Sequence, residues 1–389
     1  MFVTPLSLVD QYCHGVLRTE LGLGTFEAHL GRTAAPPAPG TTFFDTQTGF
    51  AVRRWCPPLL GLEPHCPPAR YLARRRELGV PTAGRLLLRG TGIATYLVDT
   101  GLPGDLMAPG ELAAAGDAEA REIVRLEPLA EQIADTSGTA EGFLANLGEA
   151  MQAAGASAVA FTSVAGVRHG LALAPHPPGP GEVRGAAGRW LARRRAGDRL
   201  RDPVLLRHLL WNAVGRGLPL QLHVAGEPEQ LTLFAAATAG LGTDLVLLHD
   251  APHHRHAARL ASLFPHVYAD LGPVLAHSGA RAPEVLAELL ELAPFGKLLF
   301  SSGARGLPEL HVVGAQVFRA ALGRVLGGWV AEGAWSGADA ERVAGLIAAG
   351  NARRVYRLTD AGRGAARPAA APAPRTGEGT CRPVTRAVF

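Results

Sequence analysis

The chain has 389 residues, 47% of them hydrophobic, which is enough to bury the core of one large domain or of two ordinary ones. No apolar run reaches the length of a membrane-spanning helix, and the start Met1-Phe-Val-Thr-Pro has no secretory signal, so we expect a cytoplasmic protein. The formal charge is +4, and residues 361–389 account for it with five Arg against one Glu. The other 33 basic and 33 acidic residues balance, which argues against nucleic acid as a partner.

Eight short apolar segments have the composition of β-strands. They lie at residues 7–12, 94–99, 122–126, 158–162, 218–222, 244–248, 266–271 and 297–301. Stretches with helical periodicity stand between most of them, at 141–154, 203–215, 229–239, 254–264 and 282–292. This alternation predicts a parallel sheet, and eight such units within about 300 residues favour a closed TIM (β/α)₈ barrel over an open sheet. No glycine fingerprint follows the first strand, so a nucleotide-binding fold has little support.

The interval between the first and second strands, residues 15–93, is much longer than the others and contains several aromatic residues. We predict a helical insertion that covers the mouth of the barrel, because loops at that end carry function. Residues 313–329 and 339–349 are predicted to be closing helices. Residues 359–389 are mostly Ala, Pro, Gly and Arg, which predicts a flexible tail after a single barrel domain at 1–358.

Two arginine runs and four cysteines invite functional interpretations. The runs at 74–76 and 193–195 are expected to be solvated helix faces.

The cysteines are irregularly spaced and include no CxxC pair, so a disulfide framework is not expected. Cys56 and Cys66 could bind zinc together with His65, but buried thiols in a proline-rich loop are the simpler interpretation.

Three histidines, His14, His223 and His249, lie at or just beyond the ends of predicted strands. A closed parallel barrel brings the ends of distant strands to one mouth. Imidazole suits zinc, manganese or iron, and a catalytic zinc needs three protein ligands and a water. The pattern therefore predicts a metal site, although three separate, hydrogen-bonded histidines would give the same sequence.

Several motifs resemble those of a known family. They are Leu8-Val-Asp-Gln-Tyr-Cys-His-Gly15, Ala51-Val-Arg-Arg-Trp-Cys-Pro57, Val159-Ala-Phe-Thr-Ser-Val-Ala-Gly-Val-Arg-His-Gly-Leu171, Pro219-Leu-Gln-Leu-His223, Leu245-Val-Leu-Leu-His249 and Leu292-Ala-Pro-Phe-Gly-Lys-Leu-Leu-Phe-Ser-Ser-Gly-Ala304. With these motifs the chain resembles the amidohydrolase superfamily, and in particular the amidohydrolase-related group that is similar to the N-terminal half of the fungal FluG protein. The resemblance extends to about residue 355 and implies a barrel with a metal at its mouth.

The family pattern has two histidines spaced His-x-His after strand one, a bridging Lys or Glu at strand four, single histidines after strands five and six, and an Asp after strand eight. His14, His223 and His249 match this pattern, so the resemblance implies that they are metal ligands.

Three positions depart from the family pattern. Tyr12 stands at the first histidine, Thr162 at the bridging residue and Gly303 at the aspartate. Without a bridging group we expect at most one divalent metal, with zinc favoured over manganese or iron, or none. The missing aspartate removes both a ligand and a proton acceptor, but a zinc on three neutral histidines still lowers the pKa of its water to about 7.

Other residues could supply the remaining chemistry. Glu127 follows the third strand and could act as a base, or it could be a structural partner of Arg125 or Arg168. Asp250 could orient His249, act as a base or cap a helix. Arg168 could bind a substrate carboxylate.

The sequence thus predicts an amidohydrolase-like enzyme that hydrolyses, or decarboxylates, a small carboxylate- or amide-bearing substrate at a single metal. The alternative is a catalytically reduced relative that binds a small molecule or serves as a partner subunit. The substrate cannot be read from the fold. A homodimer is possible, since barrels often form dimers.

Overall fold

The computed structural model describes residues 6–31, 35–172, 174–195, 197–249 and 252–359 of the chain. Residues Met1–Leu358 group into one compact unit. The predicted flexible tail, apart from its first residue, lies outside the described residues. No helix in the part of the chain that the structure describes is long and apolar enough to cross a membrane.

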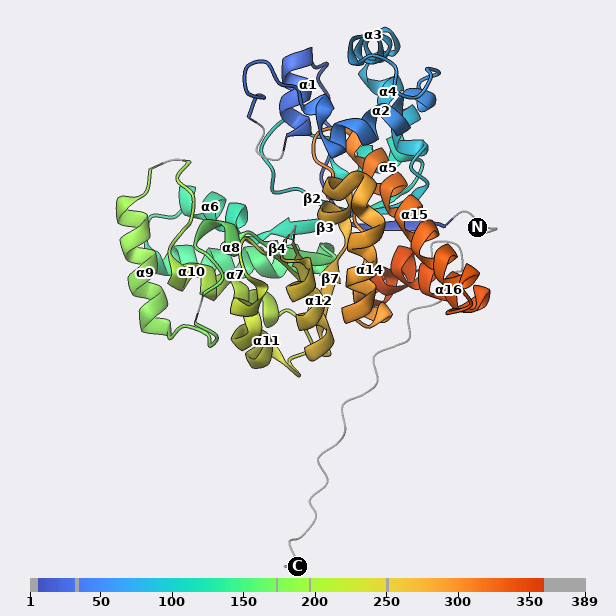
Figure 1. Cartoon of the computed structure of the whole chain (residues 1–389). Helices are drawn as coiled ribbons and strands as arrows, with labels where there is room; N and C mark the ends of the chain where they lie inside the picture. The colour runs from blue at the N-terminus through green and yellow to red at the C-terminus, as the bar shows by residue number, and fades with distance from the viewer. Residues whose placement is uncertain (1–5, 32–34, 173, 196, 250–251, 360–389) are drawn as a thin grey trace, which may run out of the picture. The chain divides into compact units, whose positions relative to one another are not determined.

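Eight parallel strands form the centre of this unit and are hydrogen-bonded in sequence order (Figure 1). They are β1 (Leu8–Cys13), β2 (Ile93–Asp99), β3 (Glu119–Arg125), β4 (Ala160–Ser163), β5 (Leu220–His223), β6 (Leu245–Leu248), β7 (Val267–Asp270) and β8 (Leu298–Leu299). The sheet closes on itself, because the amide of Gln11 donates to the carbonyl of Phe300 at 3.1 Å and that of His14 to Ala304 at 2.8 Å. The predicted TIM barrel is confirmed, and each predicted strand overlaps an observed one.

Helices follow the strands as the alternation predicts. Between β2 and β8 they are α5 (Pro109–Gly116), α6 (Leu126–Asp135), α7 (Ala140–Ser157), α8 (Ala165–Arg168), α9 (Pro180–Arg193), α10 (Pro203–Val214), α11 (Thr232–Thr238), α12 (His254–Leu263), α13 (Gly272–Ser278) and α14 (Ala282–Leu292). Several begin at side-chain caps that the sequence contains. The Asp202 carboxylate accepts from the amides of Val204 and Leu205, and the Thr139 hydroxyl accepts from Gly142.

The barrel interior combines an apolar layer with a buried polar network. Val9, Leu97 and Ile123 belong to the apolar layer. The polar network centres on Gln11, whose Nε2 donates to Asp270 at 2.8 Å and whose Oε1 accepts from the Tyr356 hydroxyl at 2.5 Å. Buried polar groups need such partners, so this network fixes the side chains beneath the mouth.

The segment that follows α16 covers the end of the barrel at which the strands begin. After α15 (Pro308–Ala331) and α16 (Gly337–Gly345), a π-helical turn at Leu346–Gly350 leads into α17 (Asn351–Val355). The Asn351 side chain donates to the carbonyls of Phe295 and Leu298, at the start of β8. The opposite end, where the strands finish, is therefore left for the functional site.

The predicted helical insertion after β1 is confirmed. It contains α1 (Leu23–Leu30), α2 (Gln47–Leu59), α3 (Pro68–Leu78) and α4 (Val80–Arg89), in the blue part of Figure 1. Tyr71 and Arg75 of α3 both donate to Glu309 Oε1 in α15, at 2.8 and 2.9 Å. Arg75 is only 3% exposed, so the expectation that residues 74–76 form a solvated face is wrong for this arginine. Its charge is instead neutralised by a buried carboxylate.

Candidate functional site

The structure places all three predicted histidines at the ends of strands. His14 follows β1, His223 is the last residue of β5, and His249 follows β6. A cavity of about 330 Å³ opens at this end of the barrel. It is lined by Tyr12, His14, Arg125, His223, Ser302 and Arg305, together with His29 and Thr48 of the insertion and His277 of α13. None of the described residues that line the cavity is acidic, so the cavity has a basic character.

His14 is held by hydrogen bonds at both ring nitrogens. Its Nδ1 lies 2.8 Å from the carbonyl oxygen of Asp99, and its Nε2 lies 2.9 Å from the Tyr12 hydroxyl. A carbonyl can only accept, so Nδ1 carries the proton. Burial lowers the pKa of His14 to about 4, so the ring is neutral at pH 7 and Nε2 accepts from Tyr12. The Tyr12 ring lies between two imidazoles, with its centre 5.2 Å from those of His14 and His223.

His223 and His249 present nitrogens without partners. Burial lowers the pKa of each to about 3, so both are neutral at pH 7. His223 Nε2 and both ring nitrogens of His249 are buried and make no well-formed hydrogen bond with any residue that the structure describes, although the backbone of Asp270 interacts with the His249 ring. An unsatisfied buried polar atom costs about 1–3 kcal/mol, which a bound ligand would recover.

The three histidines do not form a tight cluster. Among the described residues, the potential ligand atoms of one group, Asp10, Cys13 and His311, all lie within 4.8 Å of one another. His14, His223 and His249 do not meet this criterion. The metal site predicted from them therefore stays a prediction, supported by the unpartnered nitrogens but not by proximity.

The cluster of Asp10, Cys13 and His311 lies between β1 and α15. The Asp10 carboxylate accepts from the amide of Ser302 at 2.7 Å and from its hydroxyl at 2.6 Å, and His311 Nδ1 lies 3.5 Å from it. Burial raises the pKa of the Cys13 thiol, which opposes the thiolate that metals require. Hydrogen bonds to Ser302 satisfy the Asp10 carboxylate, whereas His311 Nε2 is buried without a partner among the described residues. Sequence reasoning missed this cluster because Asp10 lies inside an apolar strand.

The zinc site considered for Cys56, Cys66 and His65 finds no support. Both thiols are buried, and these three residues form no metal-binding group within the described chain. Cys56 Sγ lies 3.9 Å from the carbonyl oxygen of Glu309, so it is a packed thiol.

Glu127 lies in the first turn of α6 and is completely buried. Its Oε1 accepts from the Ser163 hydroxyl at 2.6 Å and from the amide of Val164 at 2.9 Å, whereas Oε2 has no described partner. Burial raises its pKa. It does not line the cavity and pairs with neither Arg125 nor Arg168, because α6 turns the carboxylate toward the end of β4. Neither of the two roles considered for Glu127, a base or a partner of these arginines, is supported by this geometry.

Arg168 is engaged away from the cavity. Its Nη1 bonds to Glu131 and, at 3.2 Å, to the carbonyl of Leu200. Its predicted role as a substrate clamp has no geometric support, because Arg125 and Arg305 line the cavity instead. Asp250, the third predicted catalytic residue, lies outside the described residues.

The three positions that depart from the family pattern all lie within the described residues. Tyr12 lines the cavity and binds His14. Thr162 is buried in β4, and its hydroxyl has no partner among the residues described. Gly303 lines the cavity with φ of +60°, and a Cβ at this position would lie 2.9 Å from Pro273 Cγ.

Two groups near the mouth were not predicted. Arg305 follows β8, and its Nη2 donates to the carbonyl of Gly31 in the insertion at 2.8 Å. Asp270 ends β7, accepts from Gln11 and from the Ser301 hydroxyl, and has its pKa raised by burial to about 7. The position of Asp270 at the end of a predicted strand was a usable signal, the same one that identified the histidines.

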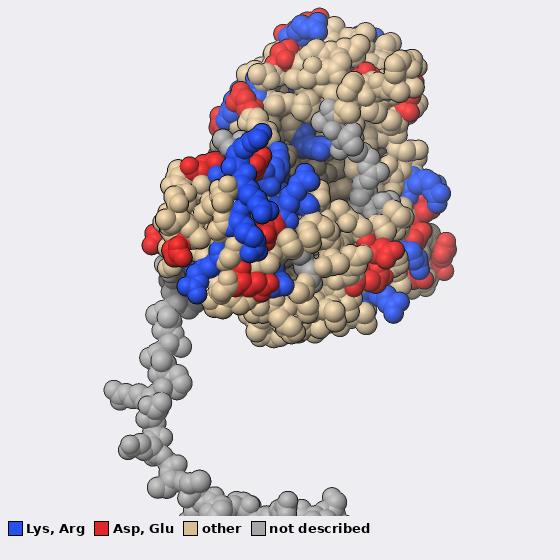
Figure 2. All heavy atoms as spheres, turned by 90° about the vertical axis from the view of Figure 1, so that its left-hand side faces the viewer, with Lys and Arg blue, Asp and Glu red and all other residues tan. Residues whose placement is uncertain are grey.

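Figure 2 shows a cluster of basic side chains beside a hollow on the face that carries α9. Arg193, Arg194, Arg199 and Arg201 line a shallow depression there. Arg193 is exposed, as predicted for the run at 193–195. Arg194 instead pairs with Asp135 at 2.6 Å and lies over the Trp190 ring.

Comparison with known proteins supports the fold and part of the resemblance. A scan against models of protein families finds no match. FluG of Emericella nidulans is 34% identical over 152 residues, which is 36% of this chain and only 18% of FluG. A structure from Lactobacillus casei described as a metal-dependent hydrolase superposes with a TM-score of 0.75 and 24% identity, covering 90% of this chain and 95% of that one. Glucuronate isomerase from Caulobacter crescentus gives a TM-score of 0.66 and 14% identity, over 94% of each chain.

The structural likenesses fall below 25% identity and establish the fold, and the FluG match establishes a sequence relation over part of the chain. Both agree with the resemblance that the strand-end motifs indicated. The chain thus has the barrel fold seen in a metal-dependent hydrolase and in glucuronate and uronate isomerases, and is related in sequence to a segment of FluG.

Proposed function

We propose that the chain is an amidohydrolase-type hydrolase that acts on a small carboxylate-bearing molecule at the mouth of the barrel, with one divalent metal, zinc by preference. The observation that carries this proposal is the cavity itself. His223, a buried imidazole with an unpartnered nitrogen at the end of β5, lines a basic cavity of about 330 Å³ together with His14. His249 is buried at the end of the neighbouring β6 but does not line the cavity. This volume is typical of sites for small molecules.

The charges at the cavity favour an anionic substrate. Arg125 and Arg305 line it, and no described lining residue is acidic. The charge of Arg125 is neutralised by Asp99, to which its Nε donates at 3.0 Å. We assign Arg305, which follows β8 and lines the cavity, to the substrate carboxylate, because guanidinium groups bind carboxylates in a bidentate manner.

The three histidines have the protonation state that a metal ligand requires. His14, His223 and His249 would hold the metal, since all three are neutral imidazoles, the form that metals bind. The carbonyl of Asp99 fixes the Nδ1 proton of His14 and so directs Nε2 toward the cavity side, as partners of ligating histidines commonly do. When bound, the ion would supply Lewis acidity and a water of lowered pKa.

Other side chains would position the substrate. The Tyr12 hydroxyl donates to His14 Nε2 at 2.9 Å, and this hydrogen bond would have to break for His14 to serve as a ligand. His29 and Thr48 of the insertion form part of the cavity wall and limit the access of water.

A second candidate, a small-molecule binder that has lost catalysis, is favoured by two specific observations. Tyr12 already satisfies His14 Nε2, and Gly303 offers no carboxylate at the end of β8. Such a protein would keep the basic cavity and bind the same class of anion without an ion.

Metal analysis distinguishes the two candidates. The hydrolase predicts about one equivalent of zinc in the purified protein, lost in His223→Ala and retained in Cys13→Ser. A folded protein without metal supports the binder. Loss of metal in Cys13→Ser but not in His223→Ala would instead place the ion at Asp10 and His311 and contradict the proposed site.

A further inference from the structure

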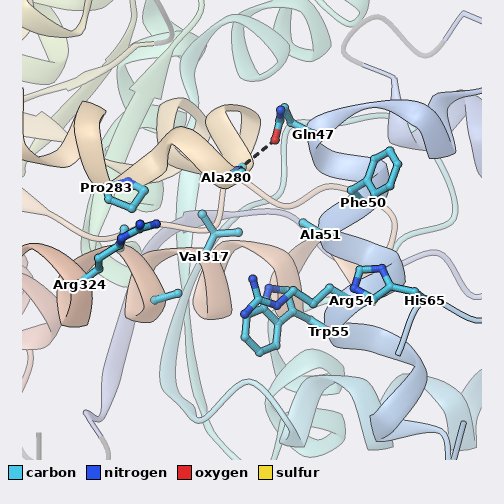
Figure 3. Close-up of a pocket in the computed structure, with 13 residues that line it drawn as sticks. Gln47, Phe50, Ala51, Arg54, Trp55, His65, Ala280, Pro283, Val317 and Arg324 are labelled. Carbon is cyan, nitrogen blue, oxygen red and sulfur yellow. Dashed lines mark hydrogen bonds between the residues drawn. The ribbon is translucent and has the colours of Figure 1, made fainter. Parts of the chain in front are cut away.

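A second cavity of about 480 Å³ lies between the insertion and α15 (Figure 3). Its walls come from α2, from α15 and from the turn that follows α13. It shares no lining residue with the cavity at the mouth, although α2 and α15 contribute to both. It is therefore a separate site rather than an extension of the first.

Two arginines reach this cavity from opposite walls. Arg54 projects from α2 and Arg324 from α15, as Figure 3 shows. Neither guanidinium has an ion pair or a hydrogen bond with a residue that the structure describes, and none of the described lining residues is acidic. Two uncompensated positive charges facing one hollow attract an anion. Each guanidinium could bind a carboxylate with two parallel hydrogen bonds.

Aromatic groups of the insertion form one side of the cavity. The guanidinium of Arg54 lies over the Trp55 ring, 4.2 Å from its centre, which holds both groups in a defined position. Phe50 lines the same side and is 48% exposed, an unusual exposure for a large apolar side chain next to a cavity. His65 completes this wall. Flat rings of this kind stack on a planar apolar ligand.

We propose that this second cavity binds a small aromatic carboxylate, with the carboxylate between Arg54 and Arg324 and the ring against Trp55 and Phe50. Val317, Ala320 and Ala321 of α15 provide an apolar surface for the opposite face of the ring. The site requires neither the metal nor the histidines of the mouth, so it does not depend on the proposed hydrolase activity.

Calorimetric titration of the full chain with benzoate tests the assignment, and benzamide is the matched neutral ligand of nearly the same shape. Benzoate is expected to bind, benzamide to bind about tenfold more weakly or worse, and Arg54→Gln and Arg324→Gln each to weaken benzoate binding about tenfold. Arg342→Gln is the control, because this exposed arginine pairs with Asp339 and lies outside the cavity. It should leave the affinity unchanged.

A third variant distinguishes benzoate binding at the second cavity from binding at the mouth of the barrel. Arg305→Gln removes the guanidinium assigned to the substrate and should not alter benzoate binding at the second cavity. The assignment is overturned if benzoate does not bind at about 10 mM. It is equally overturned if Arg54→Gln and Arg324→Gln bind benzoate like the wild type. Loss of binding in Arg305→Gln alone would show that benzoate occupies the cavity at the mouth. That result would contradict the second site and leave the proposed function unaffected.

Discussion

Arg125 and Asp99 form a buried ion pair at the adjoining ends of β3 and β2. Arg125 Nε donates to Asp99 Oδ2 at 3.0 Å, and the other carboxylate oxygen accepts from the amide of Gly101 at 2.8 Å. The backbone carbonyl of the same aspartate binds His14. Burial alone would raise the pKa of Asp99, but nearby His14 and Arg125 hold it below its ordinary value. This pair therefore fixes the end of β2, whose carbonyl orients His14, the first predicted ligand.

Removing one partner of this ion pair should lower the free energy of unfolding more than removing both partners. Arg125→Met leaves a buried carboxylate unpaired and should lower the free energy of unfolding by about 3 kcal/mol. The double variant Asp99→Asn/Arg125→Met leaves no buried charge and should recover part of the loss, since Asn can still accept from Gly101. Urea denaturation of the three proteins measures the coupling. A double variant as unstable as Arg125→Met would contradict this account.

The hydrogen bond from Tyr12 to His14 predicts an effect on metal affinity. Tyr12→Phe removes the proton that occupies His14 Nε2 and should strengthen zinc binding by up to about tenfold if His14 is a ligand, because no hydrogen bond has to be broken first. Competition with a chromophoric chelator measures this change. Tyr96→Phe is the control, since that hydroxyl contacts Thr91 away from the cavity. An unchanged affinity in Tyr12→Phe would remove His14 from the ligand set.

Asp270 predicts how stability depends on pH in metal-free protein. Burial raises its pKa to about 7, so the folded state keeps a proton that the unfolded state loses near pH 4. The free energy of unfolding should therefore fall as the pH rises from 4 to 7, by about 1 kcal/mol per pH unit from this group. Asp270→Asn should flatten the profile of the chelator-treated protein over that window. A variant with the same slope as the wild type would show that Asp270 ionises normally.

The insertion is tied to the barrel through Glu309. Arg75→Gln removes the charge that neutralises this buried carboxylate and should weaken the attachment of α3 to α15. Limited proteolysis should then cleave within residues 60–79 faster than in the wild type. Arg74→Gln, which removes a half-exposed neighbour paired with Glu77, is the matched control and should not change the rate. Equal cleavage rates in both variants would mean that packing alone holds the insertion.

The barrel could be predicted from sequence because its strands are buried on both faces and read as short apolar runs between helical stretches. Helices such as α5 escaped prediction, since Pro109–Gly116 is short and consists mostly of Gly and Ala. The strand-end rule located three histidines correctly but could not say how close their rings come.

Side-chain direction in β1 could not be read from alternation. Gln11 and Tyr12 both belong to the interior, although they are adjacent, and Cys13 packs with the helix-facing core. The register between β1 and β2 is irregular between Asp10 and Cys13, which explains the break in alternation. Residues from loops, such as Arg305, were missed because no local pattern tells which loop side chains enter a cavity.

From the backbone conformation and contacts of Gly303 we predict that an aspartate at this position, as in the family pattern, destabilises the fold. Its φ of +60° is a conformation that aspartate tolerates better than most residues, but a Cβ here would lie 2.9 Å from Pro273 Cγ. Gly303→Asp should therefore lower the free energy of unfolding by about 1–2 kcal/mol and leave zinc content unchanged. Gly303→Ala introduces the same Cβ without a carboxylate and should be destabilised to a similar extent.

Substitution of Pro273 should relieve the steric contact that a Cβ at position 303 would make. Gly303→Asp/Pro273→Ala removes the ring that the new Cβ would meet and should be more stable than Gly303→Asp by the contact energy recovered. If Gly303→Asp alone is as stable as the wild type and binds more zinc, the proline does not block the position. The absence of aspartate would then owe nothing to the packing of α13 against the end of β8.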